Sequence, residues 1–210
     1  MAEKVPPLPE IIAALQAGVA EEENYRYLFD LCYSPLKGFF LRNGCPAEDC
    51  LDLIQETFLG IYRGIATFRG EAKFETWLFQ IAANAERKAR RRGATVKRRG
   101  TEVSLDAKPD AGLPEIGETL ASSAPGPDED ALNHERSERL HQAVAGLPTQ
   151  MRRCLILRID RGLTYSEIGT VLRLSPGTVK SHLFEARHRL QEDLGRDFAA
   201  LLARGDEADS

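Results

Sequence analysis

The segment LTYSEIGTVLRLSPGTVKSHLFEARHRL, residues 163–190, has the pattern of two short helices joined by a tight turn. Thr164 and Glu167 have the spacing of a capping box, which predicts that the first helix begins just after Thr164. Ser175 is a favoured N-cap residue, and Pro176 suits the first position of a second helix because its missing N–H costs nothing there. The segment therefore predicts a helix-turn-helix motif.

The second predicted helix separates an apolar face from a polar, cationic one. Its apolar face consists of Val179, Leu183, Ala186 and Leu190. A polar outer face of this kind is typical of a recognition helix, which enters the major groove of DNA. The alternative is a plain helical hairpin inside an all-α bundle. If the helix reads DNA, we expect Lys180 and Arg187 to contact phosphates and Ser181, Phe184 and Glu185 to face base edges. The residues expected to contact DNA are Thr178, Lys180, Ser181, His182, Phe184, Glu185 and Arg187.

Composition favours a soluble intracellular protein with one or two domains in its 210 residues. No signal peptide or bilayer-length apolar run is present, so we expect a cytoplasmic protein with no stable membrane insertion. No phosphate-binding glycine loop, catalytic triad spacing or metal-ligand cluster is visible, so we expect neither an enzyme nor a cofactor or metal. The four cysteines are expected to be reduced thiols: Cys32, Cys45, Cys50 and Cys154.

The net charge of −4 hides a separation of charge along the chain. Residues 86–99 contain eight cations and one acid, whereas residues 101–130 contain eight acids and one lysine. Segregated charge predicts different partners for the two segments. The acidic segment is also rich in proline and poor in apolar periodicity, which is typical of a linker. We therefore expect a flexible acidic linker at residues 95–130 between two domains.

A helix is predicted at residues 47–65, with an apolar stripe and an acidic stripe on different faces. The stripe expected to be buried consists of Leu51, Ile54, Phe58, Ile61 and Ile65. Asp49, Asp52 and Glu56 fall on another face, with Leu53, Gln55 and Leu59 close to them. An acidic stripe beside apolar residues suits a basic, partly apolar partner helix. The alternative is a solvated charged face, and the pattern alone leaves both open.

A loop is predicted at residues 66–72, followed by a helix from Phe74 to about Arg92. The apolar side of that helix is expected to contain Phe74, Trp77, Leu78, Ile81 and Ala85. Aromatic residues upstream of a cationic helix end suit single-stranded nucleic acid, because bases stack on rings while phosphates meet Arg and Lys. The alternative is that Phe74 and Trp77 belong to the core.

Three strings resemble bacterial RNA polymerase sigma factors of the extracytoplasmic-function group. They are DLIQETFLGIYR at 52–63, FRGEAKFETWLFQIAANAERKARRR at 68–92, and the segment from Leu147 through the helix-turn-helix. The resemblance implies an all-α protein with a helical region 2 domain at 22–94 and a region 4 helix-turn-helix domain at 131–194. Residues 1–21, with a short helix at 10–17, form an N-terminal extension. The short tail at 195–210 leaves no room for a large regulatory domain.

The resemblance also implies partners: core RNA polymerase, promoter DNA and an anti-sigma factor or another regulator, with one copy bound per polymerase. Docking on the β′ clamp helices is implied for Asp49, Asp52, Leu53, Gln55 and Glu56, and the β subunit is implied as a further partner. Binding of the minus-ten element, with capture of a flipped base, is implied for Phe68, Arg69, Gly70, Ala72, Asn84, Arg87, Lys88 and Arg91. The second domain is expected to read the minus-thirty-five element through the outer face of its second helix.

One departure from the family pattern is Lys88, which stands where many members have Asp, so local pairing is expected to differ there. The helix-turn-helix string also resembles that of response-regulator-type activators, which bind duplex DNA as dimers. Such an activator needs an α/β receiver or ligand domain before the helix-turn-helix. The N-terminal half of this chain has the pattern of helices alone, which favours a sigma factor.

Overall fold

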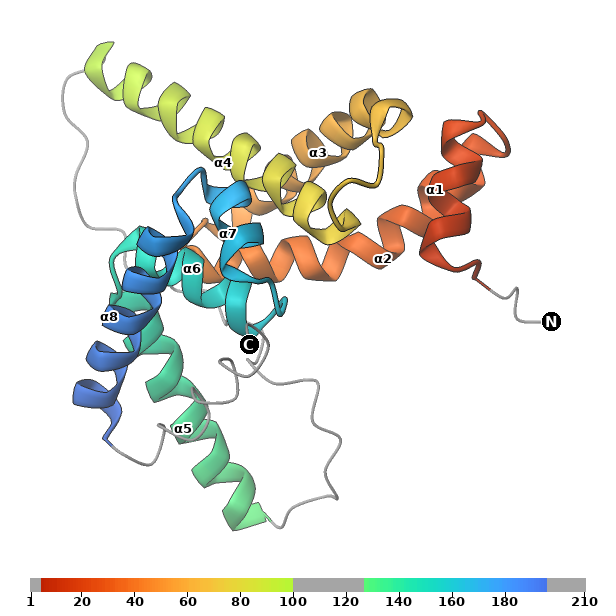
Figure 1. The fold of residues 1–210 in the computed structure, drawn as a ribbon. Coiled ribbons are helices and arrows are strands. Elements are labelled where there is room, and N and C mark those ends of the chain that lie inside the picture. Colours follow the sequence, from red (N-terminus) through yellow and green to blue (C-terminus); the bar gives the residue numbers. More distant parts are fainter. Residues whose placement is uncertain (1–4, 100–126, 196–210) are drawn as a thin grey trace. The chain divides into compact units, whose positions relative to one another are not determined.

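The computed structural model describes residues 5–99 and 127–195. Within these ranges the regular structure is entirely helical, which confirms the predicted all-α fold (Figure 1). The chain forms two compact units, the first built from α1 to α4 and the second from α5 to α8. Most of the predicted linker and the C-terminal tail lie outside the described residues.

The first unit begins with α1 (Leu8–Gln16) and α2 (Glu21–Arg42), which continues through Pro35. α3 (Ala47–Gly64) and the short 3-10 helix η1 (Ile65–Thr67) follow, and α4 (Phe74–Arg99) completes the unit. α3 and α4 pack antiparallel, with Gly64 beside Trp77 at one end and Glu56 beside Lys88 further along. Fully buried side chains come from all four of these α-helices: Ile11, Leu28, Leu36, Phe39, Phe40, Ile54, Ile61 and Phe79.

The predicted buried face of α3 is partly wrong. Leu51 was expected in the core but is 50% exposed, whereas Leu53, expected on the acidic surface, is 7% exposed. The buried side instead consists of Cys50, Leu53, Ile54, Thr57 and Ile61. Leu51 and Leu53 are two positions apart and so point to nearly opposite sides of the helix, about 200° apart, and packing against neighbouring helices decides which of them is buried.

α4 is longer than predicted, since it ends at Arg99 rather than near Arg92. Gly93 does not stop it, because one glycine costs a helix only about 1 kcal/mol and no proline follows within its length. Phe74 and Leu78 are buried as expected, while Trp77 is half-buried. The first residues of the predicted linker therefore belong to this helix.

The second unit contains α5 (Pro127–Gly146), α6 (Thr149–Ile159), α7 (Tyr165–Leu172) and α8 (Pro176–Leu194). α5 begins at Pro127, within the segment predicted to be linker. α8 packs against each of the other three helices. Its predicted apolar face is confirmed as core: Val179, Leu183, Ala186 and Leu190 are all buried. The helix-turn-helix therefore rests on a small core shared by the four helices.

Candidate nucleic-acid and protein-binding surfaces

The turn between α7 and α8 is fixed by backbone conformation as well as by its caps. Arg173 adopts the left-handed region with φ of 59°, and the N–H of Leu174 donates to the Gly169 carbonyl at 2.9 Å. A Cβ on Gly169 would lie 2.7 Å from the Leu174 carbonyl oxygen, which is closer than packed atoms approach. Only glycine therefore lets α7 and the turn come this close.

Both predicted caps are present at the starts of α7 and α8. The Thr164 hydroxyl accepts from the Glu167 N–H at 3.3 Å, and the Glu167 carboxylate accepts from the Thr164 N–H at 2.8 Å. At α8 the Ser175 hydroxyl accepts from the Thr178 N–H at 3.0 Å. These bonds satisfy backbone donors that have no partner within a helix, so each helix has a fixed first residue.

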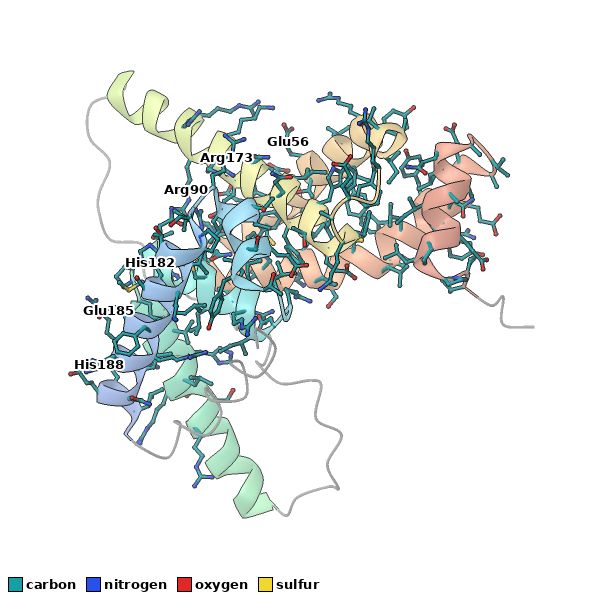
Figure 2. All side chains as sticks on the ribbon, in the orientation of Figure 1. Glu56, Arg90, Arg173, His182, Glu185 and His188 are labelled. Atoms are coloured by element: carbon teal, nitrogen blue, oxygen red, sulfur yellow. The ribbon has the colours of Figure 1, made fainter. Side chains whose placement is uncertain are left out.

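The face of α8 opposite the core carries the predicted DNA contacts. Lys180, Ser181 and Phe184 are exposed, and Phe184 is 70% exposed. Thr178, His182, Glu185 and Arg187 have intermediate exposure. His182, Glu185 and His188 follow one another along the helix (Figure 2). All seven predicted residues therefore belong to one element, with the exposed ones on its outer side.

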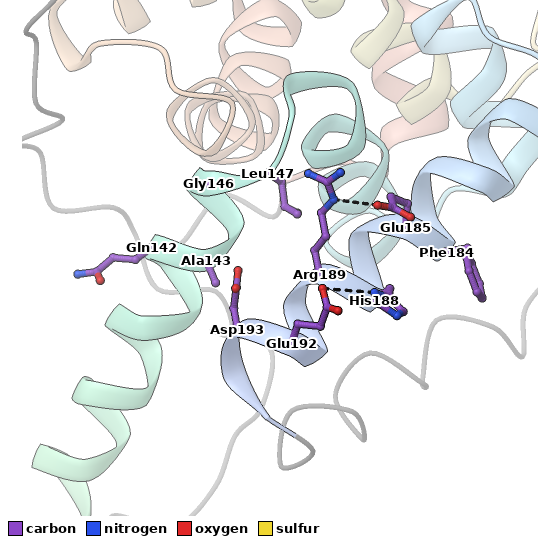
Figure 3. A pocket seen from close by; sticks show the side chains of 10 residues that line it. All are labelled: Gln142, Ala143, Gly146, Leu147, Phe184, Glu185, His188, Arg189, Glu192 and Asp193. Carbon is purple, nitrogen blue, oxygen red and sulfur yellow. Dashed lines mark hydrogen bonds and ion pairs between the residues drawn. The ribbon is translucent and has the colours of Figure 1, made fainter.

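Glu185 is already bonded within its own helix. Its Oε1 accepts from Arg189 Nε at 2.9 Å, and His188 Nδ1 lies 3.4 Å from the Glu192 carboxylate in a similar arrangement (Figure 3). Phe184 and Glu185 also line a groove between α8 and α5. This groove was not predicted from the sequence, because its other wall comes from α5, which begins about fifty residues before α8.

The loop between η1 and α4 holds Phe68 among aromatic rings. The centroid of the Phe68 ring lies 5.1 Å from that of Trp77 and 5.9 Å from that of Phe74, with a T-shaped arrangement in the second pair. Gly64 leaves room for Trp77, since a Cβ there would meet the indole at 3.0 Å. Phe74 therefore belongs to the core, as one of the two interpretations of the aromatic residues expected. Phe68 and Trp77 are partly accessible, as the other interpretation, stacking of bases on the rings, requires.

The remaining loop residues are open to solvent. Arg69, Gly70 and Ala72 are exposed, and the Arg69 side chain is 83% exposed. Gly70 has φ of 70°, a conformation that side chains rarely adopt, and nothing lies within 4 Å of a Cβ built there. Gly70 is therefore needed for the backbone conformation of the loop and not for a close contact within the protein.

The cationic half of α4 presents the other predicted minus-ten residues. Positions 84, 87, 88 and 91 recur at steps of three and four, which puts them on one side of the helix. Lys88 and Arg91 are exposed, whereas Asn84 and Arg87 have intermediate exposure. Arg87 Nε donates to the Ala83 carbonyl at 3.1 Å.

Lys88 reaches across the seam between α4 and α3. Its Nζ donates to Glu56 Oε1 at 2.5 Å, and this hydrogen bond lowers the pKa of the Glu56 carboxyl. These two residues were predicted to have different partners, DNA for Lys88 and protein for Glu56. The structure brings them together because antiparallel packing places one turn of α3 beside one turn of α4.

The exposed side of α3 is more apolar than predicted. Leu59 is 48% exposed and Tyr62 is 59% exposed, on a face shared with Leu51 and Gln55. Asp49 and Asp52 are also exposed. Rings of α2 border this surface, since Tyr25 contacts Tyr62 and Phe29 contacts Phe58, with centroids 5.4 and 4.8 Å apart. Leu59 was expected beside the acidic stripe, whereas Leu51 was expected in the core and Tyr62 was assigned to neither face.

The cysteines are free thiols, in line with the prediction, and three of the four are buried. Burial raises the pKa of Cys32, Cys45 and Cys154 to about 12, so all three stay protonated at neutral pH. Among residues 5–99 and 127–195, no three His, Cys, Asp or Glu side chains gather as metal ligands would. In the same ranges no helix has the length and apolarity needed to cross a bilayer.

Family models match most of the described chain. Residues 25–95 match the model of sigma-70 region 2, and residues 137–190 match that of sigma-70 region 4. The RNA polymerase sigma-H factor of Pseudomonas aeruginosa is 34% identical over 157 residues, which is 75% of this chain and 79% of the relative. The extracytoplasmic-function sigma-E factor of Escherichia coli K12 is 32% identical over 145 residues, covering 69% and 73%.

Two solved structures share the fold. CnrH, in complex with the cytosolic domain of CnrY, has a TM-score of 0.59 and 20% identity, with 90% of this chain and 97% of that chain covered. The sigma factor RpoE, in complex with the anti-sigma factor NepR from Bartonella quintana, has a TM-score of 0.57 and 21% identity, covering 83% and 99%.

The chain belongs to the sigma-70 family, as a sigma factor of the extracytoplasmic-function type. Its function is therefore to direct RNA polymerase to promoters at the start of transcription. The activator alternative is not supported, because region 2 of the sigma-70 family occupies the N-terminal half, where an activator would have its receiver domain. The family is one of transcription factors rather than of enzymes.

Proposed function

We propose that the exposed face of α3 docks on the β′ clamp helices of core RNA polymerase. One observation carries this proposal: Leu51, Leu59 and Tyr62 are exposed side by side with the polar residues Asp52 and Gln55. Exposed apolar side chains rimmed by acids suit a partner that is basic and partly apolar. Glu56 adds a carboxylate that stays ionised at a lower pH than an ordinary glutamate does, because the hydrogen bond from Lys88 lowers its pKa. Leu53, being buried, supports this face from within.

The docking proposal is tested with Asp52→Arg combined with Gln55→Arg, which reverses the charge of the face without touching the core. We expect association with core polymerase to be lost while the circular dichroism spectrum is unchanged. Glu22→Arg, at an exposed position in the first turn of α2, is the matched control and should bind normally. Wild-type affinity of the double variant would remove α3 from the interface.

The loop from Phe68 to Lys73 is proposed to capture a base of the melted minus-ten element. Phe68 offers a ring that is held by Trp77 and is still partly accessible, and stacking of a base on an aromatic ring is worth about 1–3 kcal/mol. The exposed Arg69 and the α4 residues Arg87, Lys88 and Arg91 supply charge for phosphates. Asn84 is proposed to contribute a polar contact to the captured base.

α8 is proposed to read the minus-thirty-five element in the major groove. Its capped N-terminus carries Thr178, Lys180 and Ser181, at the end of a recognition helix that meets base edges. His182, Phe184 and Arg187 extend the contact along the helix. Glu185 is bonded to Arg189, so its proposed contact with cytosine requires an exchange of partner on binding.

The protein is proposed to act in the cytoplasm, as one copy per polymerase, with further contacts to the β subunit. Regulation by a protein partner is supported by the two solved relatives, whose structures are complexes with CnrY and with the anti-sigma factor NepR. Co-purification of the tagged chain from its host, followed by mass spectrometry, tests this part. Recovery of polymerase subunits without any specific regulator would leave the docking proposal standing and remove the regulator.

A further inference from the structure

We propose that α1 is part of the promoter-opening apparatus, with Gln16 as a positioning residue for the loop that begins at Phe68. This inference rests on the proposed role of that loop. α1 precedes the residues matched by the region 2 family model, which begins at residue 25. Sequence analysis left it as an extension without a role.

The Gln16 side chain joins two parts of the chain that are far apart in sequence. Its Nε2 donates to the carbonyl of Ile65 at 3.1 Å and to the carbonyl of Phe68 at 2.6 Å, over separations of 49 and 52 residues. The N–H of Phe68 itself donates to the Ile65 carbonyl at 3.1 Å. One amide nitrogen, with its two N–H donors, therefore closes the end of η1 and holds the first peptide of the loop.

α1 is itself held firmly enough to act as an anchor. Ile11 is fully buried and Leu15 is 5% exposed, so the helix is packed on the first unit, where it contacts η1. Asn24 fixes the turn into α2, because its Nδ2 donates to the carbonyls of Val19 and Ala20 at 3.0 and 3.1 Å. The buried helix thus carries the Gln16 amide to the exposed start of the loop.

Phe68 is consequently held from two directions. Trp77 and Phe74 contact its ring, while Gln16 holds its carbonyl. The ring contacts set where the aromatic face lies, and the backbone contact sets where the loop leaves η1. Loss of the amide frees the backbone of the loop without removing any ring. The free energy of ordering the loop must then be supplied when a base binds, which weakens binding of the base.

The test uses Gln16→Met, which keeps the length of the side chain but removes both donors. Holoenzyme made with this variant should bind a single-stranded minus-ten oligonucleotide about three- to tenfold more weakly, as expected if the lost positioning of the loop is worth about one hydrogen bond. Its affinity for core polymerase and for duplex DNA carrying only the minus-thirty-five element should stay unchanged. Glu10→Met, exposed in the first turn of the same helix, should behave as wild type in every assay.

Trp77 gives a second readout, because it is the only tryptophan of the chain and its ring contacts Phe68. Its emission should shift in Gln16→Met and not in Glu10→Met, even if the melting temperatures agree. Phe68→Ala separates the two proposals. Weak oligonucleotide binding by Phe68→Ala with normal binding by Gln16→Met overturns the role of Gln16 alone. Normal binding by both variants overturns the role of the loop, and that of Gln16 with it.

Discussion

The helix-turn-helix turn and the loop at Phe68 are fixed in different ways. In the turn, the fixing contacts join residues three to five positions apart, as between Ser175 and Thr178 or Gly169 and Leu174. In the loop, the backbone of Phe68 is held by a side chain 52 residues away. Changes in the turn therefore act within a short segment, whereas the loop depends on the assembled first unit.

The largest effect is expected from Gly169→Ala. The added Cβ would lie 2.7 Å from a backbone oxygen, so α7 or the turn has to move, at a cost of about 2–3 kcal/mol. Thermal unfolding of the full chain by circular dichroism should show early loss of part of the helix signal. The emission of Trp77, which belongs to the first unit, should keep its wild-type transition. Gly177→Ala is the control, since a Cβ there meets nothing closer than 3.8 Å. Identical melting curves for both variants would contradict the close approach.

A second effect distinguishes base contacts from phosphate contacts on α8. Glu185→Arg replaces an acceptor by a donor and should change the ranking of minus-thirty-five variants by about 1–3 kcal/mol at one position. Lys180→Ala should weaken all variants alike and lower the salt slope by about one unit. A promoter library transcribed in vitro measures both. Equal scaling of every variant by Glu185→Arg would limit Glu185 to its bond with Arg189.

Ser175→Ala should cost about 1 kcal/mol, because the N–H of Thr178 loses its acceptor at the start of α8. The loss should appear as a lower urea midpoint for the second unit, with binding to core polymerase unchanged. Ser175→Asp retains an acceptor and serves as the control. If alanine at this position left the midpoint unchanged, the cap would not be what fixes the first residue of α8.

The smallest effect is expected from Lys88→Gln. The pair with Glu56 is exposed, and exposed ion pairs contribute about 0–1 kcal/mol, so the melting temperature should hardly change. The pKa of Glu56 should return toward its ordinary value, since the hydrogen bond that lowers it is weakened. NMR titration of the Glu56 carboxyl carbon measures this directly. An unchanged titration would show that Lys88 and Glu56 are separate in solution.

Features fixed by contacts between residues close in sequence could be predicted, whereas features fixed by contacts between distant residues could not. The helix-turn-helix was predicted down to its caps, because Thr164, Glu167 and Ser175 act on neighbouring backbone groups. The face of α3 was not, because the choice between Leu51 and Leu53 as the buried leucine depends on packing against neighbouring helices. Gln16 was missed for the same reason, since its two acceptors lie 49 and 52 residues away.

The candidate sites divide in the same way. The outer face of α8 could be predicted because helical periodicity alone separates it from Leu183 and Leu190. The apolar part of the proposed docking surface was predicted only in part: Leu59 was expected beside the acidic stripe, but Leu51 was expected in the core, since exposed leucines and buried leucines look alike in a sequence. The contact of Lys88 with Glu56 joins two predicted sites, and it required knowledge of how α4 lies along α3.

Under the proposed function, the loop at Phe68 opens promoters while α8 recruits polymerase to them. Permanganate footprinting with holoenzyme carrying Phe68→Ala and Asn84→Ala tests this claim most directly, alongside binding of the same holoenzyme to duplex promoter. We predict that this holoenzyme binds duplex promoter normally but opens the strands about tenfold or more slowly, as expected from the loss of one stacked base. Normal strand opening in the double variant would contradict this claim.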